Sequence, residues 1–233
     1  MTKLLRCKPI NPGIANPEKS SLRALVAVTG TIVILCLFEL VRRSPQAGIL
    51  GPGAQFEQFG DLIPAFIAFI LFLLPAGIFV TRAHEPLNSV GISRTNLWQS
   101  VVISFVFVVL MFYIQNGELL EKLQGLEQRH GIRLIYFAFI GFEEEILFRG
   151  YLQTRLVAWL GKWQGWAMAS VIMALGHFPL RMVIEDKALG DAFIDSLGLI
   201  PVSLFFGFLM LRTKNVLAPA IIHTFTNWIS ELD

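Results

Sequence analysis

The sequence predicts an all-α protein, a polytopic transmembrane helix bundle of about seven to eight helices with a polar cavity among its C-terminal helices. Hydrophobic residues make up 55% of the 233 residues and charged residues only 15%, whereas soluble domains carry about 25% charged residues. Long apolar runs recur along the whole chain, and ionisable residues interrupt only the later runs. These observations exclude an ordinary soluble domain.

Seven segments are long and apolar enough to be considered as membrane spans. A helix needs about 20 apolar residues to cross a hydrocarbon core about 30 Å thick. The predicted spans are residues 22–41, 62–81, 97–115, 132–151, 163–178, 193–211 and 216–229. An eighth helix is possible if a loop folds back into the membrane.

The chain is predicted to have a polar N-terminal tail over residues 1–21 and a single transmembrane domain over residues 22–233, with a catalytic core at about 132–230. The first span has no Ala-x-Ala pattern, which predicts a retained helix and not a cleaved signal peptide. Lys and Arg residues, among them Arg155, are somewhat more frequent on the side of the N-terminal tail, which favours a cytoplasmic N-terminus.

Charge and cysteine content exclude two other classes of protein. The net charge of +2 and the absence of a basic stripe predict no nucleic-acid partner. The two cysteines, Cys7 and Cys36, lie far apart and have no disulfide-framework or zinc-ligand spacing.

Four ionisable residues interrupt the fourth predicted span: Glu143, Glu144, Glu145 and Arg149. An ionised group at the bilayer centre costs about 2.5–3.5 kcal/mol, so such residues face the protein interior or water and are functional by default. Glu145 and Arg149 have the i,i+4 spacing of an ion pair. Glu144 lies about 100° around the helix and has Phe148 at i+4, so it is the freer base. Alternatively, the acids lie at a water interface and end the span.

Two later helices contribute further polar residues. His177 lies at the end of the fifth predicted span, while His223 and Asn227 share one face of the last. Any of them alone could be a structural residue whose hydrogen bonds hold neighbouring membrane helices together. Because three separate helices each bring such groups to membrane depth, we expect them to meet in an active site.

These motifs resemble those of a known family. Glu144-Glu145-x-x-x-Arg149, a later helix ending in His177, and His223-x-x-x-Asn227 are similar to the CAAX protease and bacteriocin-processing family (CPBP, or Abi), which includes the type II CAAX prenyl endopeptidases. The resemblance covers residues 141–227, and the first 130 residues are similar only as a hydrophobic helical scaffold. One position departs from the pattern, because Met173 replaces the phenylalanine that is usual four residues before the first histidine.

The resemblance implies an intramembrane glutamic endopeptidase without a cofactor. Glu144 and His177 would activate a water, His223 and Asn227 would stabilise the oxyanion, and Glu145 with Arg149 would orient these groups. The substrate would be a membrane-associated protein or peptide, namely a prenylated tail, a bacteriocin leader or a sorting tail. The short chain favours the plasma membrane of a prokaryote.

Two alternatives stay open. Two histidines and a glutamate could bind zinc, as in a membrane metalloprotease, although the HExxH motif is absent. A non-enzymatic transporter or helix-binding protein also buries Glu, Arg and His within the membrane, although no inverted repeat is visible in this sequence.

Overall fold

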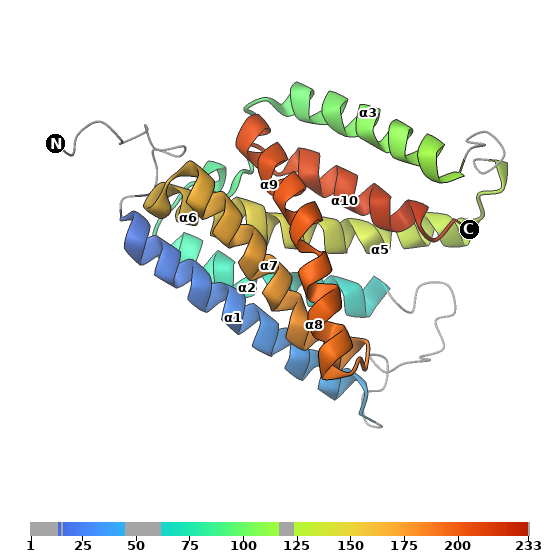
Figure 1. Cartoon of the computed structure of the whole chain (residues 1–233), viewed down its shortest axis with the longest axis horizontal. Coiled ribbons are helices and arrows are strands. Elements are labelled where there is room, and N and C mark those ends of the chain that lie inside the picture. The colour runs from blue at the N-terminus through green and yellow to red at the C-terminus, as the bar shows by residue number, and fades with distance from the viewer. Residues whose placement is uncertain (1–13, 15, 45–61, 117–123, 233) are drawn as a thin grey trace.

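The predicted all-α fold is confirmed. The computed structural model describes residues 14, 16–44, 62–116 and 124–232, and these residues form helices and connections without a strand (Figure 1). The helices are α1 (Pro17–Arg42), α2 (Leu62–Arg82), η2 (Leu87–Val90), α3 (Leu97–Asn116), α5 (Gln128–Glu144), η3 (Glu145–Gln153), α6 (Thr154–Leu160), α7 (Lys162–Ile184), α8 (Leu189–Gly198), α9 (Ile200–Thr213) and α10 (Leu217–Ile229).

Each of the seven predicted spans is helical, and five helical segments are long and apolar enough to cross a membrane. These five are α1, α2, α3, α7 and the stretch Leu189–Thr213, which covers α8 and α9. The stretch that runs from α5 to α6 is long but carries the charged residues of the fourth predicted span. The 13 residues of α10 extend only about 20 Å, so this helix is shorter than the hydrocarbon core.

The first helix begins earlier than predicted. Its N-cap is Asn16, whose side chain accepts a hydrogen bond from the nitrogen of Lys19 at 3.1 Å, and Pro17 occupies the first helical position. Both residue types favour helix starts. The helix therefore starts inside the segment predicted as a polar tail, residues 1–21, because these local signals precede the apolar run. Most of the predicted tail, residues 1–13 and 15, lies outside the described residues.

Two later helices also differ from their predicted limits. The span expected at residues 193–211 is divided at Leu199, where α8 ends after Gly198 and α9 starts with Pro201 in its first turn. The helix predicted to end near His177 instead passes through Pro179 and continues to Ile184. Proline is tolerated inside membrane helices because neighbouring helices satisfy the freed backbone groups.

The charged segment of the fourth span packs between the N-terminal and C-terminal helices. Helix α5 lies beside α10 and α2, while η3 contacts α1, α7 and α9. Helix α3 lies at the edge of the bundle against α10 (Figure 1). Large apolar side chains of α3, such as Trp98 and Phe105, are exposed, as expected for a helix that faces lipid.

The contact between α5 and α10 depends on Gly141. A Cβ atom at this position would lie 2.5 Å from Oγ1 and 3.0 Å from the backbone nitrogen of Thr224. Real Cβ atoms are not found so close to their neighbours. The absence of a side chain at Gly141 therefore lets the two helices approach within one turn of the acidic cluster and beside His223.

Arg155 is not the loop residue that the orientation argument assumed. It lies in α6, is fully buried, forms an ion pair with Glu85 and lies 3.9 Å above the centre of the Tyr151 ring. Its guanidinium also donates to the carbonyl oxygens of Ser89 and Tyr151. Because a buried arginine carries no information on loop charge, the cytoplasmic N-terminus stays a prediction with one supporting residue fewer.

Candidate active site

The helix that carries the acidic cluster changes its winding within the cluster. Helix α5 is α-helical as far as Glu144, and Glu145–Gln153 form a π-helix. Segments with i→i+5 hydrogen bonds are rare in proteins, and those that occur are often found at functional sites. The α-helical winding expected for the whole fourth span therefore ends at Glu144, although the pair between Glu145 and Arg149 that the spacing predicted still forms.

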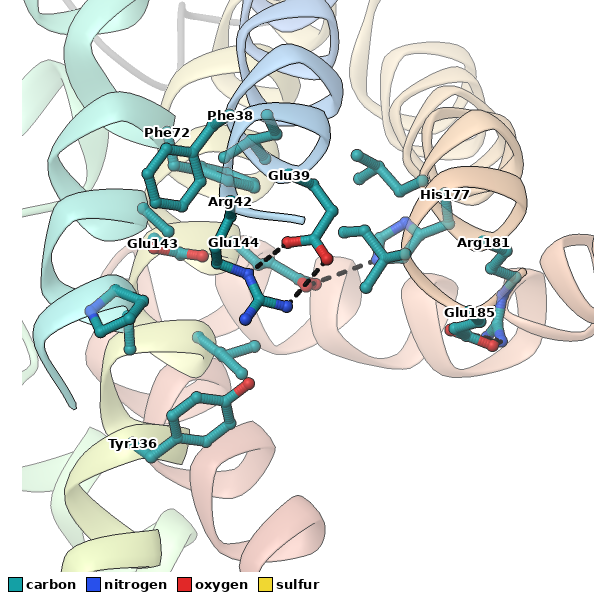
Figure 2. A pocket seen from close by; sticks show the side chains of 17 residues that line it. Phe38, Glu39, Arg42, Phe72, Tyr136, Glu143, Glu144, His177, Arg181 and Glu185 are labelled. Atoms are coloured by element: carbon teal, nitrogen blue, oxygen red, sulfur yellow. Dashed lines mark hydrogen bonds and ion pairs between the residues drawn. The ribbon is translucent and has the colours of Figure 1, made fainter. Parts of the chain in front are cut away.

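Glu144 contacts the first motif histidine. Its Oε1 lies 3.4 Å from Nε2 of His177, and Nδ1 of the same ring lies 2.8 Å from the carbonyl oxygen of Met173 (Figure 2). Because a carbonyl only accepts hydrogen bonds, Nδ1 carries a proton. Nε2 is then the ring atom that faces Glu144.

Met173 supports His177 through its backbone and not through the identity of its side chain. The carbonyl that accepts from Nδ1 is present whether the residue is methionine or phenylalanine. The Met173 side chain is buried in the same hydrophobic core as Phe72 and Phe148. The departure from the family pattern at this position therefore leaves the orienting contact of His177 intact.

Glu145 connects the fourth span to the last helix. Its Oε2 lies 3.2 Å from Nε of Arg149, as the i,i+4 spacing predicts, and its Oε1 lies 3.2 Å from Nδ1 of His223. Glu145 and Arg149 are both completely buried. The guanidinium of Arg149 also donates to Oγ of Ser203 at 3.3 Å, which ties α9 to the same group of side chains.

The His223 ring is fixed from two sides. Its ring stacks on Phe206 with the centroids 5.4 Å apart, and Nδ1 faces Glu145. Since Glu145 is paired with Arg149 and accepts, Nδ1 is the donor in this contact. Because Nδ1 carries the proton that faces Glu145, Nε2 of His223 can donate to a substrate only when the ring carries both protons.

Asn227 lies one helical turn beyond His223 on α10 and is partly buried. Within the described part of the chain, its side-chain amide makes no recorded hydrogen bond; only its backbone carbonyl accepts, from Ser230. The structure places Asn227 on the helix of His223 but does not join it to the other predicted site residues.

A cavity of about 420 Å³ adjoins Glu144 and His177 (Figure 2). Besides residues of α5 and α7, its walls come from α1 and α2, including Glu39, Arg42 and Phe72. The expectation that the polar cavity lies among the C-terminal helices is therefore incomplete, because the two N-terminal helices form part of its wall. Sequence reasoning missed this role, since their apolar runs look like scaffold.

Ion pairs connect α1 to the end of α7 beside this cavity. Glu39 accepts from Arg42 at 2.7 Å and from Arg43 at 2.8 Å, and Arg43 also pairs with Asp186 at 2.8 Å. The hydrogen bonds to Glu39 and Asp186 raise the pKa of Arg43. The negative charge of Glu39 is therefore balanced by the two arginines at the end of α1.

The arrangement can be compared with the needs of a metal ion. Among the residues that the structure describes, no three His, Cys, Asp or Glu side chains are grouped so that they could hold one. His177 faces Glu144 while His223 faces Glu145. The contact of His223 with Glu145 uses Nδ1 and is compatible with Nε2 as a metal ligand, because metal-bound histidines often donate their second ring N–H to a carboxylate.

The comparison with protein families bears on this set of residues. The model of the family described as type II CAAX prenyl endopeptidase Rce1-like matches residues 129–229. The C-terminal part of the chain is thus similar to the Rce1-like CAAX protease family. The Rce1-like region runs from α5 to α10 and contains all six predicted site residues. A search of the curated proteins and a search of the solved structures each returned no match.

Proposed function

We propose that this Rce1-like protein is an intramembrane endopeptidase in which Glu144 activates the water that attacks the peptide bond. The observation that carries the proposal is the contact of Glu144 with His177 at the wall of a cavity of about 420 Å³. Ligand pockets have volumes of about 300–1,000 Å³. A carboxylate and an imidazole at one cavity wall are suited to general base catalysis.

In this proposal Glu144 and His177 act together in proton transfer. Glu144 takes a proton from water as the oxygen attacks the peptide carbonyl, and the pair later delivers a proton to the leaving amine. His177 is held in place through Nδ1 by the Met173 carbonyl, which leaves Nε2 directed at Glu144. The proposed proton transfer therefore uses both Glu144 and His177.

His223 and Asn227 are proposed to stabilise the oxyanion of the tetrahedral intermediate. The Nε2 proton of a His223 cation and the amide of Asn227 are the donors, and preorganised donors of this kind contribute strongly in a site of low polarity. Glu145 positions the ring, while Arg149 balances the charge of Glu145. Neither Glu145 nor Arg149 needs to touch the substrate.

The proposed substrate is a membrane-associated protein or peptide. The five apolar helices place the enzyme in a bilayer, and the family description makes a prenylated C-terminal peptide the first substrate to test. A bacteriocin leader or a sorting tail is compatible with the same site. The proposed location is the plasma membrane of a prokaryote, with a cytoplasmic N-terminus.

The test measures cleavage of membrane peptides by the full chain in lipid nanodiscs. The probes are a farnesylated peptide of the Cys-aliphatic-aliphatic-X form and the same peptide without the farnesyl group. Glu144→Gln is expected to lower the rate on the order of 10²–10⁴-fold. Glu231→Gln, which changes an exposed acid on the C-terminal side of α10, serves as the control. Equal cleavage by wild type and Glu144→Gln would falsify the glutamate mechanism.

Treatment with a metal chelator tests the alternative of a zinc-dependent protease. Activity is expected to persist after incubation of the protein with 1,10-phenanthroline and removal of the chelator. Loss of activity that added zinc restores would replace the metal-free mechanism with a zinc-dependent one.

A further inference from the structure

The cavity holds a second glutamate, which the proposed mechanism does not use. Glu143 is only 7% exposed, and its Oε2 atom is completely buried without a hydrogen-bond partner among the described residues. It lines the same cavity as Glu144 and His177. Figure 2 draws Glu143 on the side of the cavity where Phe72 lies, away from His177.

The basic groups of the cavity are occupied by other acids. Arg42 gives both Nε and a terminal nitrogen to Glu39, at 2.7 and 2.8 Å. Arg181 donates to Glu185 at 3.1 and 3.2 Å. The α2 side of the cavity consists of the apolar residues Pro64, Ala65, Ala68 and Phe72. Glu143 therefore lies against an apolar wall without a cation to pair with.

Burial of this kind determines the chemical form of the side chain. An ionised carboxylate without a partner is far more costly to bury than the neutral acid. A neutral carboxyl group offers one O–H donor and one carbonyl acceptor. Unpaired buried polar groups are uncommon in native proteins and call for an explanation, and departures from good packing are expected at functional sites.

The backbone of a peptide substrate has the complementary requirement. Its amide N–H and C=O groups lose water when they enter a cavity between membrane helices, and each then needs a partner. Glu143 precedes the proposed base Glu144 in sequence and faces the same space. A peptide bond that Glu143 holds therefore lies close to the bond at which Glu144 directs water.

We propose that Glu143 binds the backbone amide of the peptide substrate beside the scissile bond and so positions that bond for the water at Glu144. The inference rests on the proposed function. Glu143 is a binding residue in this scheme and takes no part in proton transfer.

A structural role and a binding role predict opposite effects on stability. If Glu143 stabilises the fold, its replacement lowers the melting temperature. If Glu143 has no partner until a substrate binds, Glu143→Leu removes an unpaired polar group at similar volume, and the melting temperature is unchanged or higher. Glu143→Gln keeps a donor and an acceptor, so it is the matched variant that retains the proposed contact.

The first measurement is binding without turnover. The full chain with Glu144→Gln in nanodiscs is titrated with the farnesylated peptide of the Cys-aliphatic-aliphatic-X form, labelled with a fluorophore at its N-terminus. Adding Glu143→Leu to this background is expected to weaken binding on the order of 10-fold, because one backbone group of the peptide loses its partner. Adding Glu143→Gln is expected to change binding by less than about 3-fold, since the amide still pairs with the backbone.

The second measurement is turnover and stability in the chain with Glu144 intact. Glu143→Leu is expected to raise KM more than it lowers kcat, with no fall in melting temperature. Equal binding by Glu143→Leu and its parent overturns the inference, and so does a fall in melting temperature or a failure to fold. These outcomes differ from failure of the proposed function, which shows as cleavage by Glu144→Gln whatever residue occupies position 143.

Discussion

Glu144 and Glu145 are consecutive in the chain, yet they contact histidines on two different helices. Glu144 lies 3.4 Å from His177 of α7, and Glu145 lies 3.2 Å from His223 of α10. The change from α-helix to π-helix occurs between them. One glutamate faces the cavity while its neighbour is completely buried beside Arg149. This division supports different roles for the two acids of one motif.

Glu145→Gln is expected to damage both the fold and the site. It leaves the buried Arg149 without its anion, and breaking a buried ion pair by removing one partner costs about 3–5 kcal/mol. It also replaces the carboxylate that faces Nδ1 of His223 by an amide with a single acceptor oxygen. Thermal unfolding in detergent should show a large fall in melting temperature, together with lower kcat in the fraction that remains folded.

The control for this change is an ion pair near the surface. Glu231 pairs with Arg133 at 3.4 Å, and both side chains are 43% exposed. Exposed pairs contribute about 0–1 kcal/mol, so Glu231→Gln should leave the melting temperature nearly unchanged. A Glu145→Gln protein as stable as this control would show that the buried pair does not hold the helices together.

Asn227→Ala is expected to reduce turnover without destabilising the protein. Its amide makes no recorded hydrogen bond within the described residues, whereas loss of one oxyanion donor lowers kcat about 10²–10³-fold. Melting temperature and kcat should be measured on the same preparation.

Asn215→Ala is the matched variant for comparison. The Asn215 side chain donates to the carbonyl of Ser93 at 2.7 Å and accepts from the nitrogen of Leu217 at 2.9 Å. Its loss should cost stability, about 1–3 kcal/mol, and leave kcat of the folded protein intact. If Asn227→Ala behaves in the same way, the oxyanion role belongs to another group.

Gly141→Val is expected to separate α5 from α10. Because a Cβ would already lie 2.5 Å from the Thr224 hydroxyl, the larger side chain forces the helices apart, and overpacking of this kind costs about 1–3 kcal/mol. The Glu145–His223 contact depends on the same approach, so activity should fall as well.

Gly131→Ala on the same helix provides the comparison. No heavy atom lies within 4 Å of a Cβ at Gly131, and alanine is favoured over glycine in a helix by about 1 kcal/mol. This variant should be at least as stable as wild type. A similar loss of stability in both variants would mean that the close approach to α10 does not explain the glycine at position 141.

Glu85→Gln is expected to affect stability alone. The change leaves the fully buried Arg155 without its anion, at a cost of about 3–5 kcal/mol. Arg155 lies more than two turns along the helix from Glu144, so kcat of the folded protein should persist. A loss of kcat at unchanged stability would instead connect this ion pair to the site.

Apolar run length predicted the helices, and side-chain spacing predicted one contact of the site. The pair between Glu145 and Arg149 follows from i,i+4 spacing on one helix. The sequence also suggested that Glu144, His177 and His223 converge, because polar groups on three membrane helices need one another. The contact between Glu145 and His223 could not be predicted, since it depends on how closely α10 approaches α5 at Gly141.

Other features depend on tertiary contacts that local patterns do not encode. The walls contributed by α1 and α2 were missed because Phe72 and Leu35 read as ordinary core residues. Arg155 looked like a loop charge because its partner, Glu85, lies 70 residues away in the chain. The break between α8 and α9 was readable in principle from Gly198 and Pro201, whereas the π-helical winding was not.

That winding has a consequence for which changes in chain length the protein tolerates. In the π-helix each backbone hydrogen bond spans one residue more than in an α-helix. Deleting one residue between Glu145 and Gln153 would allow regular α-helical bonding, but it would rotate everything beyond the deletion by about 100°. Arg155 would then turn away from Glu85. Relatives with the same arrangement should therefore vary in the identity of residues along this stretch more readily than in their number.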